Sequence, residues 1–224
     1  MIAVKYMKVD YMQTKRQMLT MPLMVLVSVL LVKSAQDFGV MMGCSYMIFV
    51  ATIFATAPFG SCHIKNTGFL LMLPATVADR VAGRFLYGLS FMAATALLCA
   101  AGMGISCLLG FEITTMMAGL FLGNLALGVV IVALEYLLSY VLGEGKNNWQ
   151  YVGNIVRVAP GMVMYFMFMF IFTKADGEAY VADRLAFLAK RSIYAGVVVL
   201  AASLLIMAVS AAICVKAIER RDYA

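Results

Sequence analysis

Two ionisable side chains, Glu135 and Arg157, lie inside long apolar stretches of the sequence. Charged groups at membrane depth are costly and usually serve as ion pairs, substrate contacts or switches. Each lies roughly 9–12 Å from the polar turn between its two stretches, at 1.5 Å rise per residue. An antiparallel hairpin would therefore bring both to similar depth, and we predict an intramembrane polar pair. The pair can hold the hairpin together, Arg157 can instead snorkel to the surface, or the pair can act in transport; the sequence leaves these roles open.

The other reactive residues form neither a catalytic nor a metal-binding pattern. Gly145 and Lys146 resemble the end of a phosphate-binding loop, but Tyr140 and Asn147 occupy the positions where that motif needs Gly and Ser or Thr. His63 is the single histidine, which argues against a histidine-based zinc site. The five cysteines are scattered without a C-x-x-C spacing, and we predict that they are free. We therefore expect no enzymatic activity, no bound metal and no cofactor held by this chain itself.

The composition requires a lipid environment for most of the chain. Of 224 residues, 64% are hydrophobic and 12% charged, whereas soluble domains are roughly 45–50% apolar and about 25% charged. We predict an all-α integral membrane protein, because about 20 apolar residues form one spanning helix. Six such spans leave no room for a separate catalytic domain, and they are expected at about 18–35, 38–60, 84–110, 114–142, 151–173 and 192–215.

Two further segments carry amphipathic patterns outside these spans. In residues 1–17, Ile2, Tyr6 and Val9 recur at helical spacing while lysines populate the other side. This pattern predicts an interfacial helix on the membrane surface. Residues 174–191 alternate apolar and charged side chains in a way that predicts a short helical segment on the external side.

The distribution of positive charge predicts the orientation in the membrane. With six spans both termini lie on one side, and eleven Lys and Arg residues fall on that side against five on the other. The positive-inside rule then places both termini in the cytoplasm of a multi-pass cell-membrane protein. The net charge of +6 is thereby explained as an orientation signal, without a nucleic-acid partner.

The cytoplasmic segment 61–83 carries the most specific pattern in the chain. It combines polar residues, a Leu-Leu-x-Leu-Pro sequence in which Pro74 can start a new helix, and a stretch that ends in arginine at the next span. This pattern resembles the permeases of the type-2 family of ATP-binding-cassette (ABC) exporters. The matching residues are Leu70, Leu71, Leu73, Pro74, Asp79, Arg80 and Arg84.

The resemblance extends to the layout of nearly the whole chain. Permeases of that family have a basic N-terminal helix, a coupling helix between spans two and three that docks on an ATPase, and an external helical element between spans five and six. It implies that 61–83 is a coupling loop whose matching residues serve a partner ATPase, which binds the ATP and Mg²⁺. It also implies a dimer with a second permease copy or a paralogue. The implied cargo is a hydrophobic or amphipathic molecule, such as a peptide toxin or antimicrobial peptide, with lipids or small drugs as alternatives.

Two other classes of membrane protein remain to be weighed. An integral scaffold or immunity protein that binds a partner without moving cargo is the alternative to an exporter permease. A secondary transporter is disfavoured, because the sequence shows no repeated halves with broken helices and Glu135 is the sole acid deep in a span.

Overall fold

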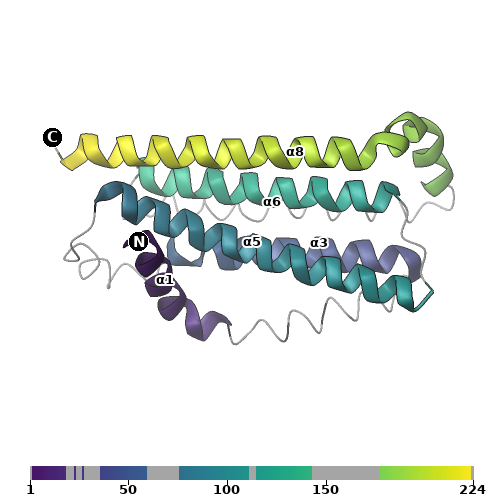
Figure 1. Cartoon of the computed structure of the whole chain (residues 1–224), viewed down its shortest axis with the longest axis horizontal. Coiled ribbons are helices and arrows are strands. Elements are labelled where there is room, and N and C mark those ends of the chain that lie inside the picture. Colours follow the sequence, from purple (N-terminus) through teal and green to yellow (C-terminus); the bar gives the residue numbers. More distant parts are fainter. Residues whose placement is uncertain are drawn as a thin grey trace.

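The structure, a computed structural model, consists of helices that run side by side (Figure 1). It describes residues 2–18, 36–59, 76–110, 115–142 and 177–222, together with Leu23 and Val27. Within these residues no strand occurs, which confirms the all-helical prediction for the described part. The elements are α1 (Ile2–Met18), α3 (Gln36–Ala55), the short 3-10 helix η1 (Ala57–Phe59), α5 (Val77–Leu108), α6 (Thr115–Leu142) and α8 (Gly177–Asp222).

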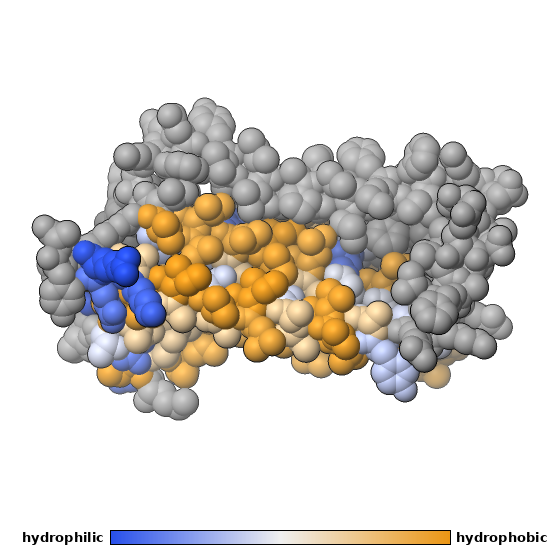
Figure 2. Space-filling model, turned by 90° about the horizontal axis from the view of Figure 1, so that it is seen from above, coloured by the Kyte–Doolittle hydropathy of each residue, from blue (hydrophilic) through white to orange (hydrophobic). Residues whose placement is uncertain are grey.

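Four of the described helices contain segments long and apolar enough to cross a membrane. These segments are Met42–Phe59, Val77–Leu108, Met117–Val141 and Ser192–Arg220. The face that α8 presents is a hydrophobic band, bounded by a hydrophilic patch at the end that carries the C-terminus (Figure 2). Leu205 on this helix is 69% exposed and Val198 is 67% exposed. An apolar surface of this extent must face lipid or another protein, as expected for a multi-pass membrane protein.

These four segments coincide with the second, third, fourth and sixth predicted spans. The first and fifth predicted spans, 18–35 and 151–173, lie outside the described residues apart from Met18 at the end of α1, Leu23 and Val27. The predicted external segment 174–191 and the sixth predicted span join into one helix, α8, from residue 177 onward. In Figure 1 the first part of α8 bends away from the axis of the remainder, at the end of the bundle opposite the two termini.

Helix α5 begins seven residues before the predicted start of the third span. Its cap is Thr76, whose hydroxyl accepts a hydrogen bond from the Asp79 backbone nitrogen at 3.1 Å and donates to the Asp79 carboxylate at 2.7 Å. The first of these bonds satisfies a backbone donor that a helix start otherwise leaves unpaired. The helix ends at Leu108, and Gly110 follows in a left-handed conformation with φ of 91°, a backbone geometry that glycine adopts without strain.

Two glycines of α6 leave room for atoms of neighbouring helices. A Cβ atom on Gly128 would lie 2.5 Å from the Met92 side chain of α5. Near the other end of α6, a Cβ atom on Gly119 would lie 2.6 Å from Ser192 of α8, whose hydroxyl donates to the Thr115 carbonyl at 2.8 Å. At Gly119 the nearby atoms include the Ser192 backbone, so the α6 and α8 backbones approach closely there, as is common between helices in membranes, whereas Gly128 leaves room for the Met92 side chain.

Candidate functional site

Helix α1 packs directly against the first turns of α5. The contact is close because Gly83 has no side chain: a Cβ atom there would lie 2.6 Å from the Tyr6 Cβ atom and 2.7 Å from the Ala3 carbonyl oxygen. Further along, the Tyr11 hydroxyl lies 2.6 Å from the Ser90 hydroxyl of α5. One face of α1 is therefore buried in the protein, in addition to whatever contact the helix makes with a membrane surface.

A buried ion pair joins the two helices at this contact. The Arg84 Nε atom lies 3.8 Å from Asp10 Oδ1, and Asp10 is 2% exposed. The Arg84 guanidinium also lies over the rings of Phe59, 4.6 Å from the centroid, and of Tyr140, 5.9 Å away. Aromatic faces attract a desolvated cation, so α1, η1, α5 and α6 all contribute to holding this side chain.

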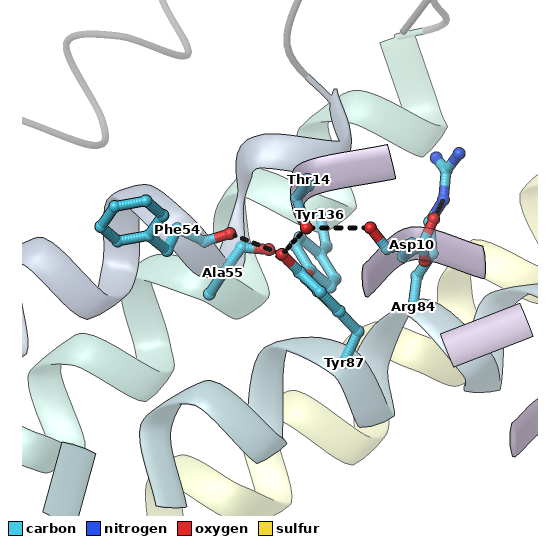
Figure 3. A network of polar contacts seen from close by, with 7 residues as sticks. All are labelled: Asp10, Thr14, Phe54, Ala55, Arg84, Tyr87 and Tyr136. Carbon is cyan, nitrogen blue, oxygen red and sulfur yellow. Dashed lines mark hydrogen bonds and ion pairs between the residues drawn. The ribbon is translucent and has the colours of Figure 1, made fainter. Parts of the chain in front are cut away.

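Hydroxyl groups continue the contact toward the end of α3 (Figure 3). The Thr14 hydroxyl lies 2.9 Å from the Tyr87 hydroxyl, which donates to the Phe54 carbonyl oxygen at 3.2 Å. The Tyr136 hydroxyl of α6 donates to the Ala55 carbonyl oxygen. The last carbonyls of a helix have no donor within the helix, and in an apolar interior they need partners from elsewhere. Tyrosines of α5 and α6 provide these partners.

These residues gather around the two ends of the predicted coupling loop. The 3-10 helix η1, which follows α3, ends at Phe59 just before the loop, and α5 begins at Val77, within the last part of the predicted loop. The arrangement holds four helices together. Among the described residues, no group of three or more potential metal ligands occurs. We call this set the root cluster, and it consists of Asp10, Thr14, Phe59, Arg84, Tyr87, Tyr136 and Tyr140.

Within the root cluster, the attraction of Arg84 does not fully offset the free-energy cost of burying the charged Asp10 carboxylate. Burial raises the pKa of Asp10 from 3.8 to about 6, while the nearby charge of Arg84 acts in the opposite direction. The geometry agrees with this balance, because the 3.8 Å separation exceeds a hydrogen-bond distance and Asp10 Oδ2 has no hydrogen-bond partner. Desolvation of a buried carboxylate can exceed the attraction of its counter-ion.

We expect stability to fall as the pH rises through the range between these two pKa values. The folded protein keeps its Asp10 proton up to about pH 6, whereas an unfolded chain loses it near 3.8. The free energy of unfolding should therefore decrease by up to about 3 kcal/mol across this window. The measurement is the monodisperse fraction after heating in detergent, by size-exclusion chromatography, between pH 4 and 8.

Asp10→Asn should remove this pH dependence and leave the variant more stable than the wild type above pH 7. Glu219→Gln, at an exposed position of α8, is the matched control and should keep the wild-type slope. If Asp10→Asn also kept that slope, Asp10 would not be the titrating group.

Three of the seven predicted coupling residues are described, and all three lie at the start of α5. Asp79 belongs to the cap of α5, and Arg80 lies in its first turn, both partly exposed. Arg84 is 9% exposed and contacts Asp10 and aromatic rings in the interior. The remaining four, Leu70, Leu71, Leu73 and Pro74, lie outside the described residues.

Of the predicted intramembrane pair, Glu135 lies within the described residues. Glu135 lies on α6 next to Tyr136 and is 3% exposed, so the acid is buried as expected for a group at membrane depth. Arg157 lies outside the described residues. Its pairing with Glu135 therefore stays a prediction.

Sequence reasoning missed Asp10, although it carries the contact between α1 and α5. The lysine pattern of residues 1–17 directs attention to the outer side of the helix. The available signal was the i, i+4 spacing of Tyr6, Asp10 and Thr14, which places three side chains able to form hydrogen bonds on one face. These three are among the most buried residues of α1.

Comparison with known proteins identifies the family of this chain. A family model described as ABC-2 family transporter protein matches residues 7–219. No curated protein and no solved structure matches the chain. The match begins within α1 and ends in the last turns of α8, so it includes all elements that form the root cluster. The chain belongs to the ABC-2 family of transporter membrane proteins.

Proposed function

We propose that this chain is the permease subunit of an ATP-driven exporter, and that the root cluster transmits movement of the coupling loop 61–83 to the spanning helices. A separate ABC ATPase binds ATP and Mg²⁺ and docks on that loop from the cytoplasm. The permease acts as a dimer in the cell membrane, with both termini in the cytoplasm. The family match over residues 7–219 supports this assignment.

The observation that carries the coupling role is the position of the root cluster. It joins the helix that enters the loop, through the Phe54 carbonyl and Phe59, to the helix that leaves it, through Arg84 and Tyr87. Tyr136 of α6 and Asp10 of α1 belong to the same cluster, so these two helices follow the movement as well. A displacement of the loop is thus distributed over four helices, as alternation between inward and outward states requires.

The proposed cargo is a hydrophobic or amphipathic molecule, with a peptide toxin or antimicrobial peptide favoured. The family resemblance supports this class, and the apolar helices suit such a cargo. Phe54, an aromatic side chain of the second span, is 6% exposed and stacks on Phe91 with ring centroids 6.2 Å apart. It therefore belongs to the packed core and does not line a path for cargo.

We expect the protein to retain an ABC ATPase encoded next to it during purification and to stimulate ATP hydrolysis. Pro74→Ala and Arg80→Gln should reduce both retention and stimulation about tenfold, because each alters the loop or the first turn of α5. Such a reduction corresponds to about 1.4 kcal/mol of lost contact energy. Glu178→Gln, on the predicted external segment, is the control and should change neither.

The same experiment separates the exporter from the non-transporting alternative. An integral scaffold or immunity protein would bind its partner without raising the rate of ATP hydrolysis. Retention without stimulation would therefore favour that alternative, and equal effects of Arg80→Gln and Glu178→Gln would argue against a coupling loop.

A further inference from the structure

We propose that the outer face of α1 is a binding surface for anionic phospholipid headgroups of the membrane around the protein. The outer face comprises the exposed side chains of α1. They are Ile2, Lys5, Lys8, Met12 and Lys15. The inference depends on the protein's lying in a membrane and holds whatever cargo it moves.

The root cluster fixes the direction in which this face points. On the opposite side of α1, Tyr6, Asp10 and Thr14 are 6%, 2% and 0% exposed. The backbone approach at Gly83 and the ion pair to Arg84 anchor that side to α5. The helix therefore cannot roll about its axis, and the outer face is held away from the protein interior.

The charges on the outer face all have the same sign. Asp10 is the single acidic residue of α1, and it lies on the buried side. Among the described residues, Lys5, Lys8 and Lys15 form no ion pair, so their charges remain available to an external anion. The face is complementary to a surface that carries closely spaced negative charges.

The apolar members of the face favour a lipid surface over an acidic protein surface. Met12 is 75% exposed and Ile2 is 42% exposed, on the same side as the lysines. At a bilayer interface, Met and Ile side chains enter the acyl boundary while lysine stems extend to the headgroups. Helix α1 packs against α5, which is long and apolar enough to cross a membrane, and the proposal therefore places the acyl boundary next to α1.

The experiment measures the acylation of individual lysines in the full-length protein, reconstituted into vesicles. One preparation contains phosphatidylcholine alone and the other equal parts of phosphatidylcholine and phosphatidylglycerol. An attraction of about fivefold per lysine near an anionic surface should slow labelling of Lys5, Lys8 and Lys15 several-fold in the second preparation. High salt should restore the rate, because it screens surface charge.

A triple variant tests the same surface by a second readout. Lys5→Gln, Lys8→Gln and Lys15→Gln together should lower the phosphatidylglycerol retained after detergent extraction by at least tenfold. The matched Lys→Arg triple variant, which keeps the charge, should retain it. The heating assay in detergent is the control that tests whether both variants are folded.

Two results would overturn the proposal. If Lys5, Lys8 and Lys15 are acylated at equal rates in the two lipid preparations, with and without the ATPase, the outer face of α1 is exposed to water and binds no lipid headgroups. Labelling that slows only when the ATPase subunit is added would assign the face to a protein partner. Because neither readout requires ATP hydrolysis or cargo, failure of the lipid proposal is distinguishable from failure of the exporter assignment.

Discussion

Gly83→Ala will loosen α1 from α5 and disable coupling, although the same substitution elsewhere in α5 stabilises the helix. The added Cβ atom would meet the Tyr6 Cβ atom at 2.6 Å and the Ala3 carbonyl oxygen at 2.7 Å, so α1 must move. Because one of these atoms belongs to the backbone, no side-chain rotation relieves the clash. We expect a net loss of about 1–3 kcal/mol in stability, together with loss of most stimulated ATP hydrolysis.

Gly102→Ala provides the matched control on the same helix. A Cβ atom on Gly102 would have nothing within 4 Å, so this variant should gain about 0.5–1 kcal/mol from helix propensity alone. The readout is thermal unfolding with a thiol-reactive fluorogenic dye, which gains access to the buried Cys44, Cys99 and Cys214. Trypsin should also cleave α1 faster in Gly83→Ala. Equal unfolding curves for the two glycine variants would refute the close approach of α1.

Arg84→Ala is expected to have the largest effect within the root cluster. It removes the cation over Phe59 and Tyr140, leaves a cavity, and deprives Asp10 of its counter-ion. Together these losses should destabilise the protein by about 2–4 kcal/mol at pH 7.5. Arg84→Lys keeps the charge but lacks the planar group that stacks on the rings, so an intermediate loss is expected in the same dye assay.

A double-mutant cycle isolates the attraction between the two charges. Without Arg84 the opposing effect on the Asp10 carboxyl disappears and its pKa rises further. Asp10→Asn should therefore stabilise the Arg84→Ala background more than it stabilises the wild type at pH 7.5. At pH 4.5, where the folded protein already holds the Asp10 proton, this difference should shrink. An identical gain in both backgrounds at pH 7.5 would mean that the two charges do not interact.

The apolar pattern of the sequence predicts much of the architecture, because a membrane span is defined locally by about 20 residues. Helices α3, α5, α6 and α8 coincide with predicted spans. Helix α5 begins seven residues before the predicted third span, because the end of an apolar run indicates the membrane boundary and not the helix boundary. The helix begins where Thr76 caps it, in a polar stretch that also contains Asp79.

The candidate site was much less predictable, because it depends on contacts between distant segments. Asp10 and Arg84 are separated by more than seventy residues, and neither position alone indicates a partner for the other. Arg84 was found through the resemblance of a motif, but its buried position follows from Gly83, Phe59 and Tyr140. The carbonyl partners of Tyr87 and Tyr136 depend on where α3 ends, which an apolar pattern does not define.

Helix α6 runs from the root cluster to the opposite end of the helix bundle (Figure 1). Tyr136 lies in the cluster, and Gly119, seventeen residues earlier, forms the close contact with Ser192 of α8. At 1.5 Å per residue these two points are about 26 Å apart along the helix axis. A rigid tilt of α6 by about 10°, pivoting at the cluster, would therefore displace its far end by roughly 4–5 Å. A tilt of this size at the cluster would therefore move the α6–α8 contact by more than the diameter of a water molecule, about 2.8 Å.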